Sequence, residues 1–126
     1  MAPAILKLGA VMPGVPDVDH PKPERLIRGN PRRETWNVAE LPVRGQFYTG
    51  VWRCEPGQWR IAFGPAEVEL FTVLQGRCRL HADDGTVQEA GPGEALFIPA
   101  GFTGAFEVLE TLTKTYAIVD GDAAQS

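Results

Sequence analysis

Short segments in which apolar and polar residues alternate run through the chain from Gln46 to Val119. Neighbouring side chains of a β-strand point to opposite faces, so a period of two residues predicts strands. No stretch of ten residues shows the 3.6-residue period of an amphipathic helix. The expected strands cover residues 47–55, 58–63, 68–74, 77–82, 86–89, 94–99, 103–110 and 113–119.

Turn-forming residues separate these segments, since Gly, Pro and Asp adopt the backbone conformations that tight turns require. A regular series of short strands joined by such turns is typical of a sandwich or a barrel. We therefore expect an all-β domain over residues 45–119. The predicted turns are Pro56-Gly57, Gln75-Gly76, Asp83-Asp84-Gly85, Gly91-Pro92-Gly93 and Pro99-Ala100-Gly101.

Residues 1–44 differ from the rest, because seven of the eleven prolines lie there and Trp36 is their one aromatic residue. Such a segment cannot form a core of its own, so we expect an extended, proline-rich N-terminal arm. The arm is either a disordered tail or a segment docked on the barrel or on a neighbouring subunit. Leu26, Ile27 and Trp36 favour docking of residues 24–44. Residues 120–126 are small and polar, and are expected to be a frayed tail.

The 126 residues suit one domain, and the formal net charge of -4 argues against nucleic acid or an anionic membrane as partner. No apolar run is long enough to cross a bilayer, and no signal peptide is visible. Cys54 and Cys78 form neither a disulfide framework nor a zinc pattern. A cytoplasmic protein with reduced thiols is expected.

Two segments match the spacing of the cupin motifs. In the first, Glu69 is followed by six residues and Gly76 (ELFTVLQG); in the second, Gly93 is followed by five residues, Pro99 and Gly101 (GEALFIPAG). The chain therefore resembles the cupin superfamily, which implies a double-stranded β-helix, or jelly-roll barrel. It looks most like the small single-domain family named for the (S)-ureidoglycine aminohydrolase cupin domain. The segments that carry this closer resemblance are GNPRRETW, GVWRCEPGQWR, PAGFTGAFEVLE and the Lys114-x-Tyr116 pair.

The usual metal-binding histidines of this family are missing. The first-motif histidines would fall at Ala62 and Gly64, or at Phe63 and Pro65 with the shorter spacing, and the second-motif histidine at Gly104. Of the usual three-histidine, one-glutamate set only Glu69 remains. A lone carboxylate holds transition metals weakly, so we expect no bound metal and no other cofactor.

Alternation along the strands predicts which side chains face the barrel interior. Metal-ligand positions of cupins face inward, so Glu69 anchors the pattern, and Ala62 and Gly104 are expected to face inward as well. The same alternation turns Arg77, Arg79 and His81 outward. The predicted pocket residues are Trp52, Arg60, Glu69, Phe71, Phe106, Lys114 and Tyr116.

Glu69, Lys114 and Tyr116 are the candidate catalytic residues. Glu69 is either a general base or binding carboxylate, or a structural partner of Lys114 or Arg60. Lys114 is either a catalytic amine or an ion-pair partner, and Tyr116 either a proton donor or a barrel-lining phenol. The cysteines are expected to pack as small apolar residues, because no histidine is placed to activate them.

Three functions remain open on the sequence alone. The first is a cupin that binds a small polar metabolite in the barrel. The second is a metal-independent hydrolase or isomerase of a small nitrogenous or sugar-like metabolite, using Glu69, Lys114 and Tyr116. The third is a structural or interaction module.

Two further expectations concern contacts. A homodimer is expected, with an exchanged arm containing Leu26, Ile27 and Trp36 covering a strand edge. Within the barrel, Glu69 is expected to pair with a cation, with Lys114 favoured over Arg60, because an isolated buried carboxylate is costly.

Overall fold

The computed structural model describes residues 4–121, and within that range the chain is almost entirely β-structure. The single helical element among the described residues is a three-residue 3₁₀ turn. In chain order the elements are β1 (Asp17–Asp19), η1 (Pro23–Arg25), β2 (Leu26–Arg28), β3 (Arg33–Leu41), β4 (Gln46–Cys54), β5 (Gly57–Ala62), β6 (Glu67–Ala82), β7 (Val87–Ala90), β8 (Ala95–Ile98) and β9 (Thr103–Asp120).

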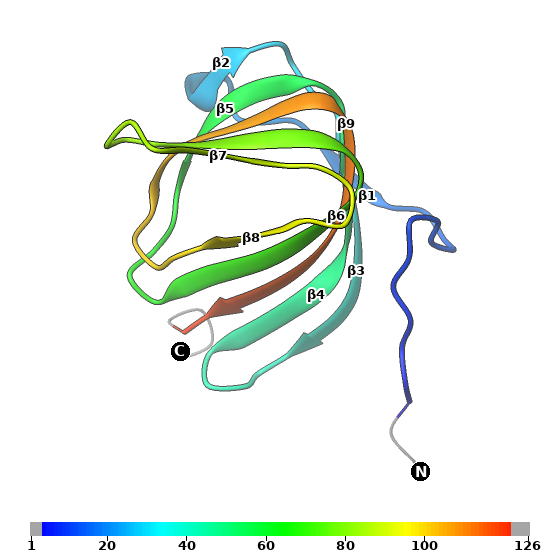
Figure 1. The fold of residues 1–126 in the computed structure, drawn as a ribbon. Helices are drawn as coiled ribbons and strands as arrows, with labels where there is room; N and C mark the ends of the chain where they lie inside the picture. Colours follow the sequence, from blue (N-terminus) through cyan, green and yellow to red (C-terminus); the bar gives the residue numbers. More distant parts are fainter. Residues whose placement is uncertain (1–3, 122–126) are drawn as a thin grey trace.

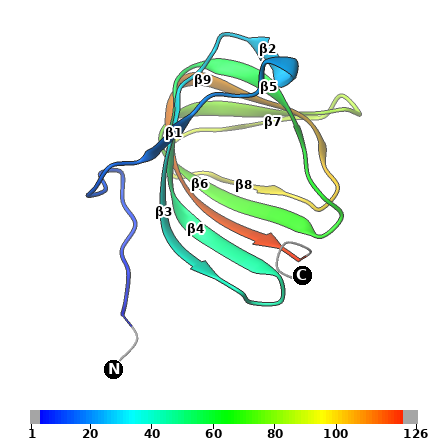
Figure 2. The same ribbon diagram turned by 180° about the vertical axis from the view of Figure 1, so that it is seen from behind.

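The strands form one curled sheet that closes into a half-open barrel (Figures 1 and 2). Its main path runs β1-β3-β4-β9-β5-β2, and β6 joins β9 on the other side while also pairing with β7 and β8. All of these pairings are antiparallel. The predicted all-β cupin barrel is therefore confirmed.

Two pairs of predicted strands are each one long, bent strand. Residues 68–74 and 77–82 both lie in β6, and residues 103–110 and 113–119 both lie in β9. The register between β6 and β9 shifts around Gly76, whose φ is 84°. A Cβ at Gly76 would collide with the carbonyl oxygen of Thr111, so glycine permits both the left-handed backbone and the close approach of the two strands. Gly76 is thus a bulge that bends the sheet, where the sequence predicted a turn.

The other predicted turns lie between strands as expected. In the β6–β7 hairpin Gly85 has a φ of 93°, and the Thr86 amide donates a hydrogen bond of 2.9 Å to the Asp84 carboxylate. Gly93 and Gly101 also have positive φ values, of 86° and 74°. These residues close tight connections because glycine reaches that conformation without steric cost.

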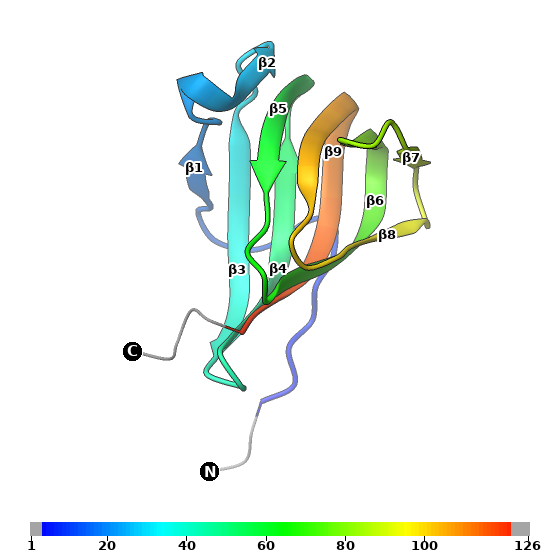
Figure 3. The same ribbon diagram turned by 90° about the vertical axis from the view of Figure 1, so that its left-hand side faces the viewer.

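Much of the predicted arm is part of the sheet. β3 pairs with β4 along its whole length, and the short β1 and β2 strands extend the edges next to β3 and β5 (Figure 3). Strands β2 and β3 lie within residues 24–44, so the sheet begins well before residue 45. Leu26 pairs with Trp59 and Trp36 with Val51 of the same chain, so these residues need no exchange between subunits.

The ends of the chain differ from its middle. Residues 4–16 have no regular structure; the first of them extend away from the barrel (Figure 1), whereas the Gly14 carbonyl accepts a hydrogen bond of 3.2 Å from the Trp36 indole of β3. Asp120 is the last residue of β9, and residues 122–126 of the expected tail lie outside the described residues. Among residues 4–121 there is no helix with the length and apolar character needed to span a membrane.

The core lies inside the curled sheet. Phe71 and Val73 of β6 and Val108 and Leu112 of β9 are fully buried there, which agrees with the inward alternation predicted from Glu69. Four aromatic rings, including that of Phe71, meet in this core. The Trp59 and Phe106 rings are stacked with their centroids 5.3 Å apart, and the centroids of the Trp52 and Phe71 rings lie 5.6 and 5.7 Å from that of Phe106. This aromatic cluster forms the floor of the candidate site.

Candidate functional site

A buried ion pair joins the two long strands inside the barrel. Glu69 of β6 and Lys114 of β9 point inward, and the Lys114 Nζ lies 2.7 Å from the Glu69 Oε2. Their side chains are only 9% and 7% exposed. The expected partner of Glu69 is therefore confirmed as Lys114. A charge that is paired at hydrogen-bonding distance avoids most of the cost of burial, and this explains how a carboxylate persists in the core.

Three aromatic rings surround the Lys114 ammonium group. Its Nζ lies 4.2 Å from the ring centroid of Phe71, 4.6 Å from that of Trp52 and 4.9 Å from that of Phe106. The faces of aromatic rings carry negative potential, so each ring stabilises the cation. The ammonium group is therefore engaged both by the Glu69 carboxylate and by these three rings.

Tyr116 lies one inward position further along β9. Its hydroxyl donates a hydrogen bond of 2.7 Å to the side-chain oxygen of Asn37 on β3. Burial, together with the nearby Glu69 charge, raises the pKa of Tyr116 to about 12. The phenol is therefore protonated at neutral pH, and its proton is engaged by Asn37.

Gly50 makes room for this arrangement. A Cβ at that position would collide with the carbonyl oxygen of Trp36 and would lie 2.6 Å from the Tyr116 hydroxyl. The glycine therefore lets β3 and β4 approach each other while Tyr116 reaches Asn37.

Asn37, Glu69, Lys114 and Tyr116 line a cavity of about 620 Å³. That volume is within the range of small-molecule sites, roughly 300–1,000 Å³. Buried aromatic and aliphatic side chains form its interior, and more exposed polar side chains form its outer part. The lining residues are Asp17, Arg33, Thr35, Asn37, Glu40, Tyr48, Trp52, Trp59, Ile61, Phe63, Glu67, Glu69, Ile98, Phe106, Lys114, Tyr116, Ile118 and Asp120.

Most of the predicted pocket residues meet at this cavity. Trp52, Glu69, Phe106, Lys114 and Tyr116 all line it. The predicted pocket residue Phe71 is fully buried and is not among the lining residues, although the centroid of its ring lies 4.2 Å from the Lys114 ammonium.

The placement of Arg60 in the pocket is wrong. Its guanidinium lies on the outer face of β5 and forms an ion pair of 2.8 Å with Asp83, with both side chains 48% exposed. On β5 the inward residues are Trp59 and Ile61, so the inward alternation is offset by one residue from the prediction, and Ala62 is exposed. A long cationic side chain is better solvated on that outer face, where a carboxylate also meets it.

The positions expected for metal-binding histidines hold no ligand side chains. Of the first-motif candidates Phe63 lines the cavity, with an aromatic ring in place of an imidazole. At the second-motif position Gly104, an added Cβ would collide with the backbone carbonyl of His81. Across residues 4–121 no three His, Cys, Asp or Glu side chains converge in a way that could hold a metal ion.

Several cavity residues were not predicted, and some of them share strand parity with residues that were. Tyr48 lies two inward steps before Trp52 on β4, and Ile118 follows Tyr116 on β9. Glu67 precedes Glu69 on β6 in the same way. Extending the alternation along each strand would have found these three. Thr35 and Asn37 lie on β3, in the segment treated as an arm, so no pattern pointed to them.

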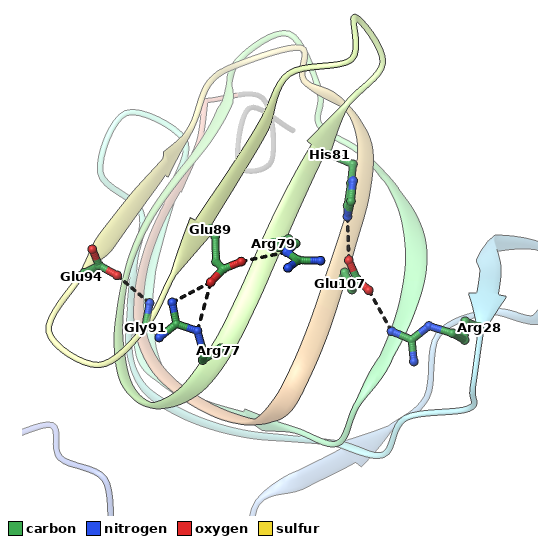
Figure 4. A network of polar contacts seen from close by, with 8 residues as sticks. All are labelled: Arg28, Arg77, Arg79, His81, Glu89, Gly91, Glu94 and Glu107. Carbon is green, nitrogen blue, oxygen red and sulfur yellow. Dashed lines mark hydrogen bonds and ion pairs between the residues drawn. The ribbon is translucent and has the colours of Figure 1, made fainter.

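His81 and the two cysteines lie away from the cavity. The His81 Nε2 is 2.8 Å from Glu107 on the outer face of the sheet, and Glu107 also contacts Arg28 (Figure 4). Cys54 and Cys78 are fully buried, and burial raises the pKa of their thiols to about 12 and about 11. Thiols that remain protonated are poor nucleophiles, so the expected packing role fits both cysteines.

Arg77 and Arg79 also face outward, as predicted. Both guanidinium groups contact Glu89 of β7, at 2.6 and 2.8 Å (Figure 4). Exposed pairs of this kind contribute little to stability, and none of these groups reaches the barrel interior.

Solved structures support the fold. A protein of unknown function from the DUF861 family of Pseudomonas syringae pathovar tomato superposes with a TM-score of 0.76 at 22% identity. The alignment covers 89% of this chain and 46% of the Pseudomonas protein, so this chain spans about half of the length of that protein. The EutQ protein of Clostridium difficile superposes with a TM-score of 0.61 at 21% identity, with 78% and 77% of the two chains covered.

Sequence comparison identifies the family. No curated protein matches the sequence significantly. The model of the EutQ-like cupin domain matches residues 34–116, a range that includes β3 to most of β9 and the inner cavity residues. Because this match covers well over half of the 126 residues, the chain belongs to the EutQ-like cupin domain family.

Proposed function

We propose that the protein binds a small organic molecule in the barrel cavity and holds it without a transition metal. The observation that carries this proposal is a cavity of about 620 Å³ in which the buried Glu69–Lys114 pair lies beside an aromatic wall. Small-molecule sites commonly combine a mainly apolar lining with a few fixed polar groups. Lys114 and Tyr116 are fixed by hydrogen bonds to Glu69 and Asn37, so the site is organised before a ligand arrives.

Binding accounts for the geometry better than acid–base catalysis. A general base needs an available carboxylate, and Glu69 is engaged by Lys114 at 2.7 Å. A general acid works best when its pKa lies near the operating pH, whereas that of Tyr116 is raised to about 12. The closer resemblance to the (S)-ureidoglycine aminohydrolase cupin domain stays a prediction, and we propose no reaction from it.

A thermal-shift screen tests the proposal. A panel of small metabolites that includes amines, alcohols, carboxylates and sugars is added to the purified protein. A ligand at 100 times its dissociation constant should stabilise the fold by about 2.7 kcal/mol, which raises the melting temperature by roughly 10 °C. Ligand entry should also change the fluorescence of Trp52 and Trp59, which line the cavity.

Two matched variants locate the binding. Ile61→Trp places a large ring in the cavity, whereas Ala62→Trp places the same ring on the exposed face of the same strand. A compound that stabilises the native protein should have no effect on the first variant and its full effect on the second. Stabilisation that persists in Ile61→Trp, or a panel without any stabilising compound, would contradict the proposal.

A further inference from the structure

The charges that line the cavity are unbalanced. Five lining residues carry carboxylates, and only Arg33 and Lys114 carry cations, which leaves a formal excess of three negative charges. The five are Asp17, Glu40, Glu67, Glu69 and Asp120.

Both cations are already matched by carboxylates. Lys114 is paired with Glu69, as described above. Arg33 donates two hydrogen bonds to Asp19, of 2.7 and 2.8 Å, and its guanidinium lies 5.4 Å from the ring centroid of Trp59. A bidentate pair of this kind is strong and directional. Neither cation is therefore available to balance the charge of an anionic ligand.

Two of the carboxylates are held by neutral donors. The Asn37 amide nitrogen donates to Glu40 at 3.1 Å, and the Gly64 backbone amide donates to Glu67 at 3.0 Å. In the part of the chain that the structure describes, neither carboxylate is in an ion pair. These hydrogen bonds orient the carboxylates and leave their negative charge in place.

The charged and apolar parts of the lining are separated by depth. Glu40 is exposed and Glu67 half-buried, whereas Trp59, Ile98 and Phe106 are buried. Negative charge therefore lies in the outer part of the cavity, and an apolar wall lies further in. Low-dielectric walls concentrate the field of such charges, so cations accumulate there and anions are repelled.

We infer that the cavity takes a small organic cation, an amine on an apolar body, with the ammonium group near Glu40 and Glu67 and the body against Trp59 and Phe106. The inference rests on the proposed function, because it assigns a ligand class to the same cavity. Attraction to the outer carboxylates supplies selectivity, and burial of the apolar body supplies affinity.

Three compounds of nearly equal shape and different charge test the inference. Phenethylamine is cationic at neutral pH, 2-phenylethanol is neutral and 3-phenylpropionate is anionic. Binding of each to the full chain is measured by calorimetry in low salt and in about 0.5 M salt. The amine should bind about fivefold or more tightly than the alcohol, as expected for one unit charge some 6 Å away in a solvated site, and the carboxylate should bind most weakly. High salt should reduce the difference.

Charge-neutralising variants assign the effect to residues. Glu40→Gln and Glu67→Gln should each weaken binding of the amine about three- to fivefold and leave binding of the alcohol unchanged. Glu24→Gln removes the same charge from the exposed η1 turn, outside the cavity lining, and should change neither.

The outcomes separate the two proposals. Equal binding of the three compounds, or tightest binding of the carboxylate, would overturn the inference while cavity binding itself stands. A preference for the amine that survives Glu40→Gln and Glu67→Gln would also overturn it. Failure of the cavity-filling test on Ile61 would overturn the proposed function instead.

Discussion

Replacing Lys114 with methionine should lower the free energy of unfolding by about 3–5 kcal/mol. The substitution keeps most of the side-chain volume and removes the cation. It leaves the Glu69 carboxylate, at 7% residue exposure, without its partner at 2.7 Å. Two unit charges at that distance attract each other by about 6 kcal/mol at an effective dielectric constant near 20, and the cost of removing both from water offsets part of this.

Replacing Glu69 with glutamine should cost less, roughly 1–3 kcal/mol. The amide still accepts a hydrogen bond from Lys114, and the ammonium group keeps its contacts with the rings of Trp52, Phe71 and Phe106. The two single variants should therefore be unequal, with the orphaned carboxylate the worse of the two. This asymmetry distinguishes an aromatic cage for the cation from a simple pair of charges.

Urea denaturation of the native protein, both single variants and the double variant measures the coupling. The double variant should be milder than the sum of the single variants by at least about 1.5 kcal/mol. A second cycle, with Arg60→Met and Asp83→Asn, is the control, because that pair has the same charges and lies in solvent. Its coupling should be much smaller than that of the buried pair.

Coupling between Glu69 and Lys114 below about 0.5 kcal/mol, the level of independent sites, would refute the reasoning. So would equal coupling in the buried and the exposed cycles, because burial would then have no influence on the strength of the pair.

Four further predictions concern the whole molecule. Burial raises the pKa of Cys54 and Tyr116 to about 12 and that of Cys78 to about 11, so the unfolded chain releases these protons first. The contribution of these three groups to the free energy of unfolding is complete below pH 9 and should be lost between about pH 9 and 12. Urea titrations at increasing pH would measure this loss, and constant stability over that range would contradict the prediction. Gly50→Ala should lower the free energy of unfolding by about 3 kcal/mol in the same assay, because the added methyl group collides with the Trp36 carbonyl oxygen and the Tyr116 hydroxyl. An unchanged urea midpoint would exclude such crowding. Elemental analysis after expression in metal-supplemented medium should find no stoichiometric transition metal, and one tightly held ion per chain would reveal an unforeseen site. Light scattering should give twice the 13.7 kDa of the chain, as expected for a two-fold dimer, and a mass of one chain would refute the dimer.

The barrel and part of its site could be predicted because local signals agreed with each other there. The Glu69–Gly76 spacing lies in β6, and the Gly93–Pro99–Gly101 spacing covers β8 and the turn before β9. The cupin resemblance placed Glu69 inside, and alternation along β9 put Lys114 and Tyr116 on one shared face, which lines the cavity. The register pairs Glu69 with Ile118 and Lys114 with Val73, and the long lysine side chain reaches the Glu69 carboxylate along the inner face. The cost of an unpaired buried carboxylate had favoured such a pair.

Alternation failed where it was carried across a connection. Residues 63–66 between β5 and β6 do not follow the period of two, so the inward face of β5 could not be derived from Glu69. One residue of offset was enough to place Arg60 and Ala62 inside and to leave Ile61 unnoticed. The chemistry of Arg60 already opposed that assignment, because a second cation in the barrel would have had no second carboxylate at its depth.

Strand β3 was missed for a reason that follows from the site itself. Strands are recognised by apolar residues on alternate positions, and this signal assumes that the inward face meets a dry core. The inward face of β3 instead carries Arg33, Thr35 and Asn37, because it borders a cavity. With polar residues on that face, the segment shows no apolar–polar alternation. Pro31 and Pro42, which lie at its two ends, also favour the prediction of an irregular segment. The polar residues with which β3 lines the cavity therefore conceal it in the sequence, and its pairing with β4 is what identifies it as a strand.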